Sequence, residues 1–306
     1  METRKIGSLE VSVVGLGCNN FGMRIDEAAT GRVVDEALDR GINFFDTADT
    51  YGKTQSEEFL GRALAGRRAG VVIATKFGAK IDDERQGAHP DYVLRAAEDS
   101  LRRLGTDHID LYQLHKPDPT VPIADTLGAL DELVAAGKVR EIGCSNFTAA
   151  MLREAEDAAA GRARFVSVQN EYSLLKREPE KEVLAECERL GIGFIPFFPL
   201  ASGLLTGKYR QGQPMPEGSR GAAGWAAADF TERNFAIVEQ LIAFAEGRGH
   251  TVLELAFSWL ATRPAVASVI AGATSPEQVR ANAAAVDWQL SPDDLAEVER
   301  IVNAAG

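Results

Sequence analysis

Short apolar runs alternate along the chain with longer stretches in which apolar residues recur every three or four positions. The runs are typical of buried β-strands and the longer stretches of amphipathic α-helices. Residues 4–17 are predicted to form a short hairpin and a first core strand. Further strands are predicted at 42–46, 71–76, 109–114, 139–144, 165–168, 193–198 and 267–271. Helices are predicted at 27–40, 56–64, 91–104, 123–136, 151–160, 178–190, 232–246, 252–261, 276–285 and 292–302.

This order gives about eight strand–helix units, and mostly continuous apolar strands indicate a parallel sheet buried on both faces. We therefore expect one domain, residues 1–306, with the α/β fold of a single (β/α)8 TIM barrel, an N-terminal β-hairpin and extra C-terminal helices. A doubly wound sheet would normally carry Gly-x-Gly-x-x-Gly after an early strand. Here Gly15-x-Gly17 is followed by Asn20 instead.

Two local features add detail to this predicted order of strands and helices. Ser56, with Glu57 and Glu58 after it, is predicted to cap the N-terminus of the helix 56–64. The stretch 203–228 is long and rich in Gly and Pro, which is typical of a functional loop.

The composition excludes several classes of protein. A formal net charge of -12 disfavours binding to nucleic acid or to an anionic membrane. The apolar region 194–205 is interrupted by prolines and is too short to span a bilayer, and no signal peptide opens the chain. Cys18, Cys144 and Cys187 are widely spaced, so we expect no disulfide, no metal site and a cytoplasmic location.

Ionisable side chains stand where three consecutive predicted strands end. Asp46 ends one strand, with Tyr51 five residues on, and Lys76 and His115 end the next two. A lone Lys or His at a strand end is more often structural than catalytic, and for Asp46 and Tyr51 the two interpretations are about equal. In a barrel, however, neighbouring strands place their carboxyl ends around one pocket, where chemistry is done.

These four side chains form a coherent acid–base set. The Lys76 ammonium is expected to lower the pKa of the Tyr51 phenol, and Asp46 to fix the lysine. His115 is expected to orient a substrate carbonyl by a hydrogen bond. Such a set is suited to carbonyl reduction if a hydride donor is present.

The spacing Asp46-x4-Tyr51, with Lys76 and His115, resembles the catalytic tetrad of the aldo-keto reductases. The phrases around these residues, at 41–52, 110–118 and 137–147, are also similar to the family's. Within the family, 203–209 and 216–220 resemble the bacterial reductases and the potassium-channel β subunits. The resemblance implies an NADP-dependent reductase of aldehydes or ketones in which Tyr51 is the general acid. The cofactor would be NADPH (NADP+), with NADH as the alternative.

The resemblance also implies the cofactor contacts. Ser145, Asn146 and Gln169 would hold the carboxamide, and Phe197 would stack on the nicotinamide ring. The backbone around 199–203 would wrap the pyrophosphate, and Lys208 and Arg220 would add positive charge. The implied cofactor site consists of Gly17, Cys18, Asn19, Asp46, Ser145, Asn146, Gln169, Phe197, Phe198, Pro199, Leu200, Ser202, Gly203, Leu205, Lys208, Arg220, Gly272, Thr274, Gln278 and Asn282.

The chain departs from the family at several of these positions. Phe198 replaces a frequent serine, Asn19 a common tryptophan and Ala281 a glutamate that contacts adenine. Gly272 stands where another branch has a lysine for the 2′-phosphate. An NADP preference would therefore depend on Arg220, Lys208 or Arg280. Trp225 is equally compatible with a pocket wall and with a hydrophobic residue that packs its own loop.

Two other functions remain open from the sequence. One is a redox-sensing or regulatory module that binds NADPH and turns over slowly, and the other is a Schiff-base aldolase that uses Lys76. The expected partner is a small-molecule carbonyl substrate. Its identity and the oligomeric state cannot be deduced from the sequence.

Overall fold

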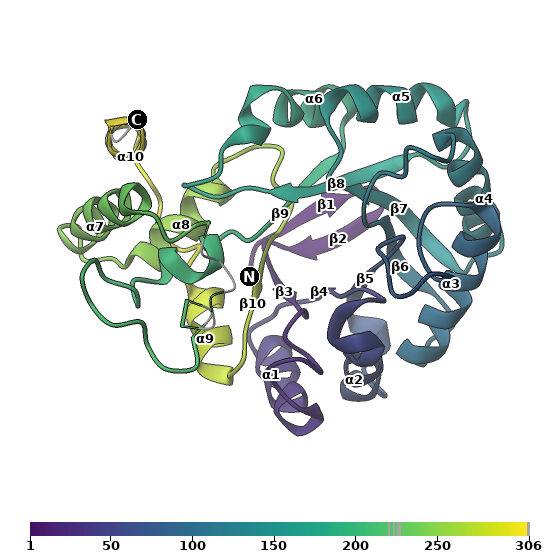
Figure 1. Cartoon of the computed structure of the whole chain (residues 1–306), viewed down its shortest axis with the longest axis horizontal. Coiled ribbons are helices and arrows are strands. Elements are labelled where there is room, and N and C mark those ends of the chain that lie inside the picture. Colours follow the sequence, from purple (N-terminus) through teal and green to yellow (C-terminus); the bar gives the residue numbers. More distant parts are fainter. Residues whose placement is uncertain (220, 223, 225–227, 305–306) are drawn as a thin grey trace.

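The computed structural model describes residues 1–219, 221–222, 224 and 228–304. Within them, eight parallel strands form a barrel, which confirms the predicted (β/α)8 fold (Figure 1). The barrel strands are β3 (Val14–Gly17), β4 (Phe44–Asp46), β5 (Val72–Phe77), β6 (Ile109–Leu114), β7 (Val139–Ser145), β8 (Phe165–Glu171), β9 (Gly193–Phe197) and β10 (Val269–Gly272).

The sheet runs in the order β10-β3-β4-β5-β6-β7-β8-β9, with every neighbouring pair parallel. Its two ends meet just before β10, where Phe194 pairs with Val266. The Phe194 amide donates to the Ala265 carbonyl at 2.7 Å, and the Ala267 amide donates to the Phe194 carbonyl at 2.9 Å. These bonds join the last two strands and close the ring.

Helices surround the barrel on its outer side (Figure 1). Helix α8 packs beside α9 and β10, whereas α7 and α10 pack against each other further out, as the extra helices. The helices are α1 (Glu27–Asp39), α2 (Gln55–Ala63), α3 (Pro90–Leu104), α4 (Ile123–Ala135), α5 (Ala149–Ala159), α6 (Val183–Leu190), α7 (Glu232–Glu246), α8 (Val252–Ala261), α9 (Pro276–Ala284) and α10 (Pro292–Ala304). The 3-10 turns are η1 (Tyr51–Thr54), η2 (Arg68–Gly70), η3 (Glu178–Lys181) and η4 (Ala201–Thr206).

The N-terminal hairpin, β1 (Thr3–Ile6) and β2 (Leu9–Ser12), lies across the ring of strands (Figure 1). Its apolar face is fully buried, with Ile6, Leu9 and Val11 at most 1% exposed. These side chains pack with inward-facing barrel residues such as Phe44 and Ile195. The hairpin therefore supplies part of the barrel's inner core, while a larger core lies between strands and helices.

Two predictions about helices were wrong. Ser56 does not cap α2, because the helix begins at Gln55 after a turn in which Gly52, Lys53 and Thr54 all have positive φ. The predicted helix 178–190 is interrupted at Glu182, whose φ of -148° and ψ of -37° are not helical. It therefore consists of the 3-10 turn η3 followed by α6.

Cys18, Cys144 and Cys187 are free thiols buried in the core. In the part of the chain that the structure describes, no helix has the length and apolar character needed to cross a membrane.

Candidate active site

The inward faces of the barrel strands change from apolar to polar towards their C-terminal ends. Side chains two positions apart lie on the same face of a strand. On β4 this face passes from Phe44 to Asp46, and on β5 it passes from Ala74 to Lys76. The polar residues therefore lie at the C-terminal mouth of the barrel, above the apolar plug formed with the hairpin.

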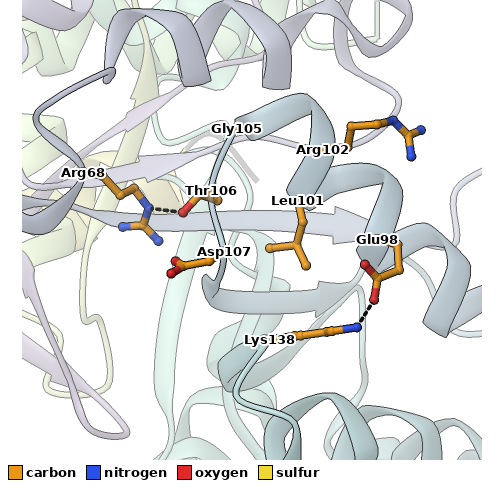
Figure 2. A pocket seen from close by; sticks show the side chains of 8 residues that line it. All are labelled: Arg68, Glu98, Leu101, Arg102, Gly105, Thr106, Asp107 and Lys138. Carbon is orange, nitrogen blue, oxygen red and sulfur yellow. Dashed lines mark hydrogen bonds and ion pairs between the residues drawn. The ribbon is translucent and has the colours of Figure 1, made fainter.

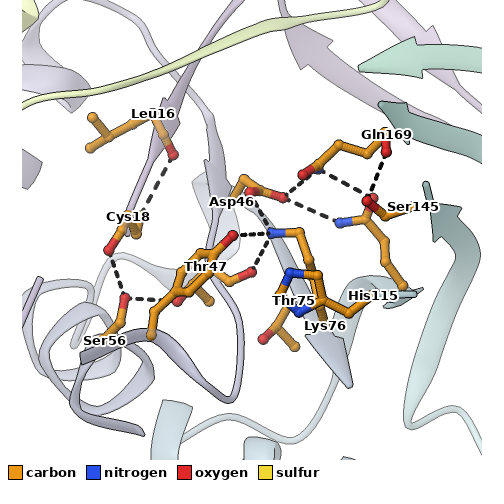
Figure 3. A network of polar contacts seen from close by, with 12 residues as sticks. Leu16, Cys18, Asp46, Thr47, Ser56, Thr75, Lys76, His115, Ser145 and Gln169 are labelled. Carbon is orange, nitrogen blue, oxygen red and sulfur yellow. Dashed lines mark hydrogen bonds and ion pairs between the residues drawn. The ribbon is translucent and has the colours of Figure 1, made fainter. Parts of the chain in front are cut away.

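Lys76 lies at the centre of the polar residues (Figure 3). Its side chain is fully buried, and its Nζ donates to Asp46 Oδ1 at 2.6 Å and to the Thr47 carbonyl at 2.8 Å. The same Nζ lies 3.3 Å from the Tyr51 hydroxyl. An ammonium has three N–H donors, and here each has an acceptor.

The second carboxylate oxygen of Asp46 is also occupied. Gln169 Nε2 donates to Asp46 Oδ2 at 2.9 Å, and Gln113 Nε2 donates to it at 3.2 Å. Because two amides and an ammonium hold this carboxylate, its orientation towards Lys76 is fixed. The sequence prediction missed Gln113, although its place two residues after the inward-facing Leu111 could have indicated it.

Tyr51 begins the left-handed turn η1. Three successive residues with positive φ, two of them with a Cβ atom, indicate local backbone strain. Ser56 follows the turn, and its Oγ donates to the Cys18 carbonyl at 2.9 Å and lies 2.8 Å from Thr47 Oγ1. These buried bonds link α2 to the loops after β3 and β4, which fixes the segment that carries the phenol.

His115 lies beside Tyr51 at the mouth. The two ring centroids are 5.9 Å apart in an edge arrangement, and the His115 amide donates to the Phe77 carbonyl. Burial, together with the charges of Lys76 and Lys116, lowers the pKa of His115 to about 3. The imidazole is therefore neutral near pH 7. Its buried Nδ1 has no hydrogen-bond partner among the described residues.

The pKa of Tyr51 differs from the sequence prediction. Burial raises it above its ordinary value, and the opposing effect of the Lys76 ammonium is smaller. Burial also disfavours the charged form of Lys76, but the negative charge of Asp46, together with the contacts to Tyr51, outweighs this and raises the lysine pKa. The phenol is thus protonated at neutral pH, as a proton donor must be.

The residues predicted to hold the nicotinamide end lie at the ends of β7, β8 and β9. Ser145 Oγ donates to the Gln169 carbonyl at 2.7 Å, and Asn146 Nδ2 donates to the His115 carbonyl at 3.0 Å. The amide of Gln169 is turned towards Asp46. The rings of Phe197 and Phe198 meet edge to face at 5.3 Å, and Phe198 is 41% exposed.

The segment after β9 is a tight turn with several left-handed residues. Positive φ angles occur at Phe198, Ala201, Ser202 and Gly203. The Ala201 and Gly203 amides donate within the turn to the Phe198 and Leu200 carbonyls, each at 2.9 Å. A Cβ atom at Gly203 would lie only 3.4 Å from Lys208 Nζ, so a cation lies beside this turn. The cation is compatible with a cofactor phosphate.

Several other residues of the predicted cofactor site would contact a cofactor only through their backbone atoms. The side chains of Cys18 and Leu205 are fully buried in the core, and Pro199 is buried as well. Leu200 is partly buried, and its aliphatic side chain has no hydrogen-bonding group. Ser202 Oγ donates to Asp229 Oδ2 at 2.7 Å.

Another group of residues of the implied cofactor site lies around the end of β10. Gly17 pairs with Gly272, and a Cβ atom at Gly272 would lie 2.9 Å from Asn19 Oδ1. Gln278 Oε1 accepts from the Thr274 amide at 2.9 Å. Asn282 is buried on α9.

Arg280 and Arg220 are two of the three cations on which an NADP preference was predicted to depend. The Arg280 guanidinium is paired with Glu36 and Glu277, each at 2.7 Å, so it would have to leave these carboxylates to contact a 2′-phosphate. Arg220 and Trp225 lie outside the described residues.

A separate groove lies at the opposite, N-terminal side of the barrel strands (Figure 2). Arg68, Thr106 and Lys138, which line it, all precede strands. The cations are paired: Arg68 contacts Asp110 and Thr106, and Lys138 contacts Glu98. This groove is therefore explained by structural ion pairs.

Comparison with known proteins gives consistent results. A family profile described as "Aldo/keto reductase family" matches residues 13–303. The chain is also 37% identical over 303 residues to "Uncharacterized oxidoreductase YrpG" of Bacillus subtilis (strain 168). That match covers 94% of this chain and 91% of the relative.

Proposed function

Because the chain belongs to the Aldo/keto reductase family, whose members generally use nicotinamide cofactors and small-molecule carbonyl substrates, we propose that it reduces an aldehyde or ketone to an alcohol with NADPH. Its similarity to an oxidoreductase supports the reaction class. The observation that carries the proposal is the contact of Lys76 with both Asp46 and Tyr51.

Each residue of the tetrad has a distinct role in this proposal. The bound nicotinamide would supply the hydride to the carbonyl carbon. Tyr51 donates its hydroxyl proton to the carbonyl oxygen, so that the carbonyl gains a hydride and a proton and becomes an alcohol. Neutral His115 offers a hydrogen bond that orients the carbonyl. Lys76 stabilises the phenolate that Tyr51 leaves behind, and Asp46 holds Lys76 in place.

The cofactor site supports a nicotinamide dinucleotide. The turn at 198–203 would follow its pyrophosphate, and the adjacent Lys208 would place a positive charge beside it. The choice of NADPH over NADH is a prediction based on Lys208 and Arg220, since guanidinium and ammonium groups favour a 2′-phosphate. The cytoplasmic location also remains a prediction from the cysteine spacing.

The test is reduction of a panel of aldehydes, ketones, sugars and pyridoxal with NADPH and with NADH in parallel. Replacement of Tyr51 by Phe removes one hydroxyl, and kcat is expected to fall by about 10²- to 10⁴-fold, the usual contribution of a general acid. The dissociation constant of the cofactor should stay within about twofold, because the phenol hydroxyl serves the substrate.

Tyr172→Phe is the matched control. It removes a phenol hydroxyl that is bonded to Glu180 outside the site, so turnover should be unchanged. Retained turnover in Tyr51→Phe would exclude Tyr51 as the acid. Binding of NADPH without turnover of any carbonyl in the panel would instead favour a regulatory module.

A further inference from the structure

Asp49 is a buried carboxyl group in the loop between Asp46 and Tyr51. Its side chain is 1% exposed, and in the described part of the chain neither carboxylate oxygen has a partner with good hydrogen-bond geometry, only the adjacent Thr50 amide as a weak contact. A carboxylate normally accepts several hydrogen bonds, and a buried carboxylate without them is very unfavourable.

The groups that face Asp49 do not compensate a negative charge. From α2 it faces Glu57, which is fully buried and negatively charged. The Arg103 guanidinium of α3 acts on Asp49 by its charge, but its Nε donates to Glu57 Oε2 at 2.6 Å. Thr75 Oγ1 donates to the other Glu57 oxygen, also at 2.6 Å. The cation in this cluster therefore already has a carboxylate partner.

The remaining neighbours do not neutralise a charge on Asp49 either. Tyr92 of α3 and Tyr112 of β6 face Asp49 with phenol groups, and the pKa of each is raised by burial and by the Asp49 charge. From β5 the ammonium of Lys76 is directed to Asp46 and has only a small effect on Asp49. Burial, followed by the Glu57 charge, raises the pKa of Asp49 to about 8, and Arg103 and the adjacent Thr50 amide oppose this less strongly.

We propose that Asp49 is a neutral carboxylic acid in the folded protein and that this state positions Tyr51. The inference rests on the proposed role of Tyr51 as proton donor. The Thr47 amide donates to the Ala74 carbonyl at 2.8 Å, and the Asp49 amide donates to the Lys76 carbonyl at 3.2 Å. These bonds attach the loop to β5 in the conformation in which the Asp49 side chain is buried.

Ionisation of Asp49 changes this arrangement. A charged carboxylate next to Glu57 must gain hydrogen bonds or solvent, so the loop has to move. Tyr51 is two residues away, and its amide donates to the Ala48 carbonyl in the same loop. Movement of the loop therefore displaces the phenol from Lys76. Asp49 is a positioning residue, and its protonation couples pH to the geometry of the site.

The first test compares the pH profile of kcat/KM in the wild type and in Asp49→Asn, which keeps the shape but cannot ionise. The wild type should lose about tenfold in kcat/KM between pH 7 and pH 9, because the neutral fraction of Asp49 falls by that factor. Asp49→Asn should lose less than about twofold. The pKa of Tyr51 is raised above its ordinary value near 10, so the phenol itself does not titrate in this range.

Asp157→Asn is the matched control, since Asp157 is an exposed carboxylate on α5, and this variant should show the wild-type profile. Equal profiles of the wild type and Asp49→Asn would overturn the proposal. So would an alkaline loss in Asp49→Asn as large as that of the wild type.

A second test does not depend on catalysis. The Tm of Asp49→Asn relative to the wild type should increase from pH 5 to pH 8 and then become constant, whereas a constant difference would show that Asp49 is ionised in the native state. If the variant does not fold, infrared spectra of the wild type decide the question. The carbonyl band of a neutral carboxylic acid should be present at pH 7 and lost by pH 9, and its absence at pH 7 would reject the proposal.

The two tests separate failure of this inference from failure of the proposed function. If the protein has no reductase activity but still shows the pH-dependent Tm difference, then Asp49 is neutral in the native state but does not position a proton donor. An active reductase with no such difference would keep the proposed function and refute the neutral Asp49.

Discussion

At the residue scale, Lys76 shows how much one buried group organises. Its ammonium serves a carboxylate, a backbone carbonyl and a phenol, and each of these comes from β4 or from the loop that follows it. Burying a charge without partners is very unfavourable, so this arrangement is needed for Lys76 to remain charged. The same contacts that stabilise the lysine hold Tyr51 at the mouth of the barrel.

His115 should make stability depend on pH on the acid side. Its folded-state pKa is about 3, whereas an unfolded histidine titrates near 6.5. Between these values the unfolded state binds one more proton than the native state. The free energy of unfolding should therefore fall by about 1.4 kcal/mol for each pH unit as the pH drops from about 6.5 towards 3.

Chemical denaturation of the wild type and His115→Asn at pH 7, 6 and 5 measures this effect. The contribution from His115 should be absent in the variant, so the wild type should lose more stability than the variant as the pH falls. The exposed His89 provides the control, because His89→Asn should follow the wild type. Parallel curves for His115→Asn and the wild type would show that His115 is not held neutral by the fold.

Substitution of Lys208 tests whether this cation contacts the pyrophosphate or the 2′-phosphate of the cofactor. Replacing it with Met removes the cation beside Gly203, and the dissociation constant should rise by about tenfold, the effect of losing one hydrogen bond to a charged group. An equal rise for NADPH and NADH is expected if the lysine serves the pyrophosphate. A rise confined to NADPH would place it at the 2′-phosphate instead.

Fluorescence titration with both cofactors measures these constants. Lys181→Met, on the distant turn η3, removes the same charge elsewhere and should leave both constants unchanged. Unaltered binding in Lys208→Met would contradict the assignment of 198–203 as the pyrophosphate site.

At the element scale, α2 and α3 approach closely because of one glycine. A Cβ atom at Gly61 would lie 2.3 Å from the carbonyl oxygen of Leu104, which ends α3. The backbone cannot yield as a side chain can, so Gly61→Ala should destabilise the protein by about 1–3 kcal/mol through overpacking. Denaturant unfolding measures the change.

Gly31 provides the matched comparison for the same substitution. It lies within α1, and a Cβ atom there would meet nothing within 4 Å. Gly31→Ala should therefore stabilise the protein by about 0.5–1 kcal/mol through the higher helix propensity of alanine. If both variants shifted stability in the same direction, close packing at Gly61 would not explain the result.

Elements with strong periodicity were predictable from the sequence. The bounds of β6, α7 and α8 agree with the prediction, because their apolar patterns coincide with their burial. The break at Glu182 was not predictable, since glutamate favours helices and its conformation depends on tertiary contacts. One such contact joins Arg177, next to η3, to Glu299 of α10, far away in the sequence.

The site shows a similar division. The sequence predicted the four tetrad residues because each lies at or shortly after the end of a strand of recognisable pattern, and the structure brings them together. Ser56 does not cap α2 because a left-handed turn, which non-glycine residues rarely adopt, precedes the helix. The sequence carried no signal for this turn. The raised pKa of Tyr51 required knowledge of its burial, since the phenol's neighbours alone indicated the opposite shift.

At the scale of the whole molecule, we propose that the hairpin and the barrel unfold together as one domain. Ile6, Leu9 and Val11 pack among side chains from strands around the ring. Ile6→Ala should lower the free energy of unfolding by about 2–5 kcal/mol, the usual cost of such a truncation in a core. Circular dichroism should show the whole transition shifted to lower temperature.

Lys5→Ala is the matched control in the same strand, because Lys5 is exposed, and its transition should coincide with that of the wild type. A hairpin that detached separately would give an early, small transition in Ile6→Ala with the main one unmoved. That outcome would contradict a single cooperative unit.

The burial of Cys18, Cys144 and Cys187 has a practical consequence. Alkylating dyes react with accessible thiolates, and none of these sulfurs is accessible in the native fold. A cysteine introduced at the exposed Asp83, in the loop between β5 and α3, would therefore be the preferred attachment point without removal of the native ones. A fluorophore placed there could report directly on ligand arrival at the mouth of the barrel.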